Sequence, residues 1–273
     1  MNGPIPAMLA DKADTVVTRP AAPHTHVTVR GLCKAFDGVP LYGGFNLDLP
    51  RGKIVSIFGP NGCGKSTLMN MIAGLLPLDA GEILFDGKSL KDTCIGYVFQ
   101  NYRDALFPWI CARDNIAYPL RRSGMKERAV RERVAELVAL FDIRFDLNRY
   151  SYELSGGQQQ TVCIMRALAP RPEVMFLDEP FSALDFEMTL FIREKLQEAQ
   201  AATGVTMVIV SHDLEDAVFL ADQILLLTRR PTRIAEIVPF DLPRPRTPES
   251  VADPEFVRVK AHTLEVFRRE MQA

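Results

Sequence analysis

The chain has 273 residues, 47% hydrophobic and 24% charged, so it can bury a sizeable core as one large domain or two modest ones. Its formal net charge of −2 argues against a general nucleic-acid or anionic-membrane surface. Five scattered cysteines, without a CxxC pair, favour reduced thiols in a cytosolic compartment over a disulfide framework. No run approaches the ~18 consecutive apolar residues of a membrane span, so we expect any role at a membrane to act through a partner.

Residues 1–25 are rich in Pro, Ala and Thr without apolar periodicity, which predicts a mobile leader. His24 and His26 are assigned to this leader, and we expect no metal role for them. From residue 27 onward, short apolar runs alternate with helical stretches, a pattern typical of an α/β sheet layered with helices. The expected strands are Val27–Val29, Phe45–Leu49, Ile54–Phe58, Glu82–Phe85, Ile95–Phe99, Val174–Leu177, Met207–Val210, Ile224–Leu227 and Ile234–Val238.

The apolar period changes to a helical one between the fifth and sixth expected strands. Met125–Phe141 places its valines and leucines on one helical face with charged residues opposite. We therefore divide one domain, 26–241, into an α/β core and a helical insertion at about 101–163. Four prolines follow the last strand, and an amphipathic helix at about Pro254–Met271 in a C-terminal extension, 242–273, is expected to pack back onto the body.

A phosphate-binding motif lies between an apolar strand and a helical stretch. The run GPNGCGKST matches G-x-x-x-x-G-K-[ST], and its strand–loop–helix context makes a chance glycine-rich turn the weaker interpretation. The loop backbone is expected to wrap the nucleotide phosphates, with Lys65 as a point charge and the Ser66 hydroxyl as a ligand of Mg²⁺. The predicted nucleotide contacts are Gly59, Pro60, Asn61, Gly62, Cys63, Gly64, Lys65, Ser66 and Thr67.

Polar side chains at the ends of three further strands predict the catalytic groups. Asp178 ends a buried strand and can hold Mg²⁺, while Glu179 can orient or deprotonate the attacking water. His212 after the next strand can contact the γ-phosphate, and Gln100 can ligate Mg²⁺. The alternatives are a helix cap for the two acids and a surface role for His212; Gln100 alone is uninformative.

A second phosphate cradle follows in Leu154-Ser155-Gly156-Gly157-Gln158. A serine and two glycines that open a helix expose N–H groups and a hydroxyl at the positive end of the helix dipole. One chain with two cradles suggests that two copies sandwich ATP, each supplying half of every site.

These motifs, in this order, resemble the ATP-binding subunit of ABC transporters over nearly the whole chain. The resemblance implies a P-loop NTPase (RecA-like) core of the α/β class, with an antiparallel β-subdomain and an inserted α-helical subdomain. It also implies a head-to-tail dimer around two ATP, with Ser182–Asp185 crossing between the sites and Asp185 near nucleotide. Phe36 matches the aromatic residue that stacks on adenine, although a core phenylalanine is the alternative.

Three segments are similar to the importers for nitrate, sulfonates and taurine: Ala105–Trp109, Ser211–Asp222 and the tail from Thr228 onward. The resemblance implies a protein peripheral to the cytoplasmic face of the inner membrane, which works with a permease and, indirectly, a solute-binding protein. Ala105–Trp109 is the expected permease contact, with subdomain core as the alternative. The solute does not follow. Thr161 replaces an arginine common in the family, which puts one helix-anchoring contact in doubt.

Two other functions stay open at this point. The first is a soluble ABC-type ATPase acting on nucleic acid or ribosomes, although the chain has neither a long coiled-coil insertion nor a basic stripe. The second is the ATPase of an exporter.

Overall fold

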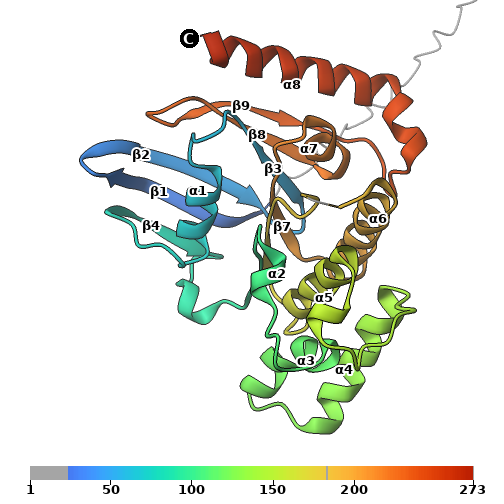
Figure 1. The fold of residues 1–273 in the computed structure, drawn as a ribbon. Coiled ribbons are helices and arrows are strands. Elements are labelled where there is room, and N and C mark those ends of the chain that lie inside the picture. Colours follow the sequence, from blue (N-terminus) through green and yellow to red (C-terminus); the bar gives the residue numbers. More distant parts are fainter. Residues whose placement is uncertain (1–23, 183, 273) are drawn as a thin grey trace, which may run out of the picture.

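The computed structural model describes residues 24–182 and 184–272. Its central sheet has six strands in the order β5-β6-β7-β3-β8-β9, parallel except for the antiparallel edge strand β9 (Figure 1). The three innermost strands are buried along their full length, as expected for parallel strands covered on both faces. The six strands are β3 (Ile54–Phe58), β5 (Ile95–Val98), β6 (Val174–Asp178), β7 (Thr206–Val210), β8 (Gln223–Leu227) and β9 (Ile234–Pro239).

A second, antiparallel sheet of order β2-β1-β4 covers one face of the first. It comprises β1 (Thr25–Phe36), β2 (Val39–Pro50) and β4 (Ala80–Phe85). Side chains of both sheets, including Val29, Leu47 and Val208, share one hydrophobic cluster with those of α1 (Lys65–Ile72). Burial between these layers positions α1 and the loop before it against the central sheet.

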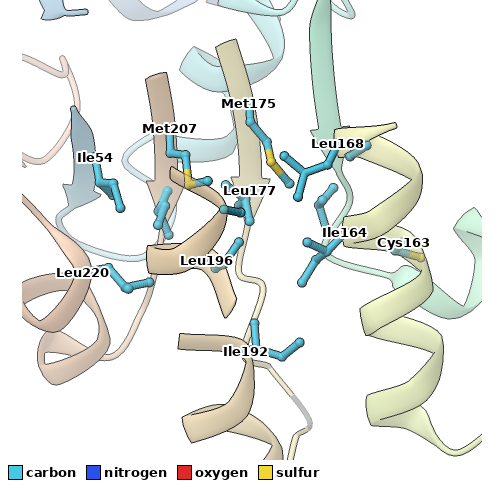
Figure 2. Packing of buried hydrophobic residues seen from close by; sticks show 14 of the residues in the cluster. Ile54, Cys163, Ile164, Leu168, Met175, Leu177, Ile192, Leu196, Met207 and Leu220 are labelled. Atoms are coloured by element: carbon cyan, nitrogen blue, oxygen red, sulfur yellow. The ribbon is translucent and has the colours of Figure 1, made fainter. Parts of the chain in front are cut away.

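Helices of the insertion and of the second half of the chain pack on the other face of the central sheet. In Figure 2, Ile164 and Leu168 from one helix and Ile192 and Leu196 from another surround Met175 and Leu177 of β6. The helices are α2 (Tyr102–Ala105), α3 (Ala112–Arg122), α4 (Glu127–Leu140), α5 (Gly156–Leu168), α6 (Phe186–Thr203), α7 (Leu214–Leu220) and α8 (Pro254–Gln272), with short 3-10 turns at Leu90–Asp92, Ser151–Glu153 and Pro248–Ala252. None of the described helices is long and apolar enough to cross a bilayer.

The expected secondary structure is confirmed except at the start of the chain. All nine strands and the helices around Met125–Phe141 and Pro254–Met271 are present, but β1 continues to Phe36 and β2 begins at Val39, well beyond the expected bounds. The assignment of His26 to the leader is wrong: β1 begins at Thr25, and His26 lies buried in it. Its imidazole Nδ1 is 2.6 Å from the hydroxyl of Thr206, which provides the polar partner that burial requires. Residues 1–23 of the predicted leader lie outside the described residues.

The C-terminal extension packs onto the body, as expected. Phe256, Val259 and Val266 of α8 join the core that lies over β8 and β9 (Figure 1). Arg246 precedes this helix and is buried, yet it donates to main-chain carbonyls that include those of Val218 and Ala221 at the end of α7. The buried guanidinium therefore satisfies carbonyls that the helix leaves unpaired.

Candidate active site

The phosphate-binding loop runs from the end of β3 to the start of α1, and two of its glycines are required by close packing. A Cβ at Gly59 would lie 2.9 Å from the carbonyl oxygen of Leu227. Gly64 has φ 101°, and a Cβ there would lie 2.9 Å from the side chain of Leu41. A larger residue at either position would displace the loop from β8 or from β2.

Lys65 occupies the centre of this loop. Its side chain is 7% exposed, and Nζ donates to the carbonyls of Gly59 (2.9 Å) and Pro60 (3.1 Å). The ammonium group therefore lies across the loop, where a bound phosphate is able to replace the carbonyls as acceptor. An adjacent cavity of about 570 Å³ is lined by Asn61, Gly62, Gly64, Lys65, Ser66, Thr67, Glu179, His212 and Arg230.

Ser66 and Asp178 meet at the edge of the cavity, from α1 and the end of β6. The Ser66 hydroxyl donates to Oδ1 of Asp178 at 2.9 Å, and burial raises the pKa of this carboxyl. A hydroxyl and a partly desolvated carboxylate side by side are hard oxygen ligands, so the pair fits Mg²⁺. The bound cation would neutralise phosphate charge. Gln100, the third predicted ligand, instead donates from Nε2 to Oε2 of Glu179 (2.8 Å), so its metal role stays a prediction.

Glu179 is held beside the cavity by its backbone and by two side chains. Its φ of 47° is unusual for a residue other than glycine, and its N–H donates to the carbonyl of Val210 at 2.9 Å. Its Oε2 accepts from Gln100 and lies 3.3 Å from Nδ1 of His212. The predicted catalytic residues Glu179, His212 and Lys65 thus line one cavity, and the carboxylate is oriented as a general base requires.

The second cradle, Ser155–Gln158, begins α5. Ser155 Oγ accepts from the N–H of Gln158 (3.3 Å), and the Gln158 side chain accepts from the N–H of Ser155 (3.0 Å), so the two form a capping box. A Cβ at Gly157 would lie 2.6 Å from the side chain of Met188, so a larger residue there would displace that side chain. No residue of this cradle lines the described cavity at the phosphate loop.

Three further predicted positions lie apart from that cavity or have a structural role. Phe36 ends β1 with its ring 43% exposed, available for stacking but not lining the cavity. Asp185 caps α6 by accepting from the N–H of Met188 at 2.8 Å. The buried hydroxyl of Thr161 donates to the carbonyl of Gly157 (2.8 Å), which supplies a local anchor for the helix behind the cradle.

Sequence reasoning missed three residues that contact the phosphate loop. Arg230 lines the cavity and donates to the carbonyl of Gly62. Thr232 donates to the carbonyl of Cys63, and Tyr42 donates to that of Gly64. Arg230 lies in the tail that resembles the importers, yet nothing in its local sequence indicates a partner 168 residues away.

Comparison with known proteins identifies the family. The sequence profile described as "ABC transporter" matches residues 42–182, which hold the phosphate loop, Gln100, the second cradle and the two acids. The chain belongs to the ABC transporter family.

The relatives include ATP-binding proteins of import systems. The aliphatic sulfonates import ATP-binding protein of Bacillus licheniformis is 39% identical over 224 residues, which cover 81% of this chain and 85% of that protein. The sulfate/thiosulfate import ATP-binding protein of Neisseria meningitidis serogroup A is also 39% identical, over 74% of this chain and 58% of that protein. The dimeric ATP-binding cassette MJ0796, solved with ADP and Pi, superposes with a TM-score of 0.69 at 29% identity over 79% of this chain and 99% of that one.

The fold class, the ATPase activity and the use of ATP with Mg²⁺ are thereby confirmed. The position of each residue at the cavity indicates its role. We predict that the loop backbone and Lys65 bind phosphate oxygens, that Ser66 and Asp178 would hold the metal ion, and that Glu179 takes a proton from water.

Proposed function

We propose that this chain is the ATP-hydrolysing subunit of a bacterial ABC importer for a small solute of the nitrate, sulfonate or taurine type. It works as a peripheral protein on the cytoplasmic face of the inner membrane. One observation carries the proposal: the chain holds two phosphate cradles, of which only the loop at 59–67 lines the described catalytic cavity.

The cradle at Ser155–Gln158 is complete, but among the described residues it does not line the cavity at the phosphate loop. Ser155 is exposed and Gly156 is half-buried, while Gly157 is buried, at the start of a 13-residue helix, the end that favours an anion. A second copy arranged head-to-tail brings this helix onto the phosphate held at Lys65. ATP then joins two copies, and hydrolysis removes contacts that exist only in the closed dimer.

A surface for the permease lies beside Gln100. The ring of Trp109 is 72% exposed and packs on Phe107 at 5.3 Å between centroids, and Phe107 packs in turn on Tyr118 at 4.7 Å. Buried Asn115 bonds to both the N–H and the carbonyl of Phe107, so the segment is held in one shape.

The neighbouring groove supports the same assignment. It has a volume of about 700 Å³ and a mainly apolar lining, to which Leu75, Tyr97, Phe99 and Ala105 contribute. Gln100 lines this groove and bonds to Glu179, so a helix that occupies the groove is one contact away from the catalytic carboxylate. A permease helix with an apolar face fits it.

Reconstitution tests the proposal. The chain is expressed with its neighbouring permease genes and the complex is placed in liposomes with the solute-binding protein. We expect ATPase activity that rises with solute-loaded binding protein, together with ATP-dependent uptake. Stimulation by RNA, DNA or ribosomes without permease binding would favour the soluble ATPase, and transport that needs no binding protein would favour an exporter.

A further inference from the structure

The tight turn that joins β8 to β9 reaches back to the phosphate loop. Arg230 Nε donates to the carbonyl of Gly62 at 2.7 Å, and the Thr232 hydroxyl donates to the carbonyl of Cys63 at 2.5 Å. Thr232 is 2% exposed, and its own N–H donates to the carbonyl of Leu41 at 2.8 Å, so its side chain has little freedom to turn away.

A third donor comes from β2. The hydroxyl of Tyr42 donates to the carbonyl of Gly64 at 3.0 Å, and the side chain is 1% exposed. Burial raises the pKa of this phenol, so it stays a neutral donor. Three consecutive carbonyls of the loop, at residues 62–64, therefore each accept a hydrogen bond from a side chain outside the loop.

The direction of these carbonyls decides the direction of the loop N–H groups. In a trans peptide the C=O and N–H of one unit point in opposite directions. Because the carbonyls of Cys63 and Gly64 point toward the buried Thr232 and Tyr42, the N–H groups of Gly64 and Lys65 point the opposite way.

We propose that Tyr42, Arg230 and Thr232 are positioning residues of the ATPase, which fix the carbonyls of residues 62–64. Thr232 and Tyr42 thereby aim the N–H groups of Gly64 and Lys65 at the nucleotide phosphates, while the N–H of Cys63 donates to the carbonyl of Pro60 at 3.2 Å. Arg230 also places a cation in the cavity that Lys65 lines. This inference rests on the ATPase activity and is independent of the importer and its solute.

Two substitutions remove a hydroxyl with little change of volume: Thr232→Val and Tyr42→Phe. Each leaves a loop carbonyl without its anchor, and we expect the KM for ATP and the Kd for ADP to rise about 3- to 10-fold, the effect of one oriented hydrogen bond. We expect kcat at saturating ATP to fall by a smaller factor, because the groups around Glu179 are untouched. Thr232→Ser keeps the hydroxyl and should restore the KM.

Thr263→Val is the matched control, since Thr263 is also fully buried but donates only within α8, to the carbonyl of Val259. Thermal unfolding without nucleotide reports on the fold of every variant. The proposal is overturned if Thr232→Val and Tyr42→Phe bind nucleotide as tightly as Thr263→Val, or if Thr232→Ser loses as much affinity as Thr232→Val. Should Thr232→Val fail to fold, Tyr42→Phe decides by the same measurement.

Discussion

At the scale of single residues, Glu179 carries the clearest prediction. Its carboxylate lies within 3.3 Å of His212 Nδ1 and accepts from Gln100, so it is positioned without being buried away from water. We expect Glu179→Gln to slow ATP hydrolysis by about 10²–10⁴-fold, the usual range for a positioned base, and to leave ATP binding intact. Single-turnover hydrolysis and fluorescent-nucleotide binding measure the two effects. Glu132→Gln, on the exposed side of α4, is the control, and a Glu179→Gln enzyme with the wild-type rate would remove Glu179 from this role.

His26 predicts a pH dependence of stability. Burial, followed by the charge of Arg51, lowers its pKa from 6.5 to about 4. Between these two pH values the unfolded chain binds a proton that the folded protein excludes. The free energy of unfolding therefore falls as the pH is lowered through this window, by at most about 1.4 kcal/mol per pH unit from this group.

The measurement is urea unfolding between pH 4 and 7. His26→Gln keeps a polar group for Thr206 but has no titrating ring, so its pH slope should be shallower than that of the wild type. His24→Gln, at an exposed position, should keep the wild-type slope. Equal slopes for His26→Gln and the wild type would contradict the assignment.

At the scale of elements, the segment before α8 depends on one buried cation. Arg246 is 3% exposed, and Gln197 of α6 bonds to both its N–H and its carbonyl. Burial lowers its pKa to about 10, so it remains charged at neutral pH. We expect Arg246→Met to lower the free energy of unfolding by at least about 3 kcal/mol, because several main-chain carbonyls lose their donor.

Arg258→Met is the control for that loss. Arg258 lies on the exposed face of α8 and pairs with Glu255 one turn away, so its replacement should change the free energy of unfolding far less than Arg246→Met does. Denaturant titration of both variants compares them. Equal stability of the two variants would show that the extension does not depend on the buried guanidinium.

The segment Ala105–Trp109 is tested by transport. We expect Trp109→Ala to abolish most ATP-dependent uptake in the reconstituted importer, because an exposed indole lost from an interface centre costs about 2 kcal/mol or more. The ATPase rate of the isolated protein should be unchanged. The control is Val257→Ala, which shortens an exposed apolar side chain on a different element, α8. Full uptake by Trp109→Ala would favour the interpretation that the segment is subdomain core.

Across the elements, strands were predictable and long-range polar contacts were not. Four of the five residues of β6, and four of the five of β7, form a continuous apolar run, so the burial of these strands follows from composition. His26 was misassigned because its burial depends on Thr206, 180 residues away. Arg230 and Thr232 were missed for the same reason, since their partners in the phosphate loop lie 168 and 169 residues away.

At the scale of the whole molecule, one chain brings most of the candidate site residues together but leaves the second phosphate cradle apart from them. The residues of the phosphate loop, Asp178, Glu179 and His212 come together because parallel strands β3, β6 and β7 end at one edge of the sheet. Ser155–Gln158 belongs to α5 and joins no such cavity within the chain. The sequence pattern was sufficient to identify both cradles. It could not show how the second cradle reaches a nucleotide, because that requires a second copy of the chain, which we propose.

A cross-link between two different molecules tests that dimer most directly. One cysteine replaces Asn61, which lines the phosphate cavity, and the other replaces Ser155 of the second cradle. The two substitutions are made in separate, differently tagged chains, and both chains also carry Glu179→Gln. Each variant alone controls for the five native cysteines. With a short bismaleimide, we predict a cross-linked pair in the mixture, dependent on ATP. A mixture that binds ATP and yields no more cross-linked product than the separate variants would contradict the shared site.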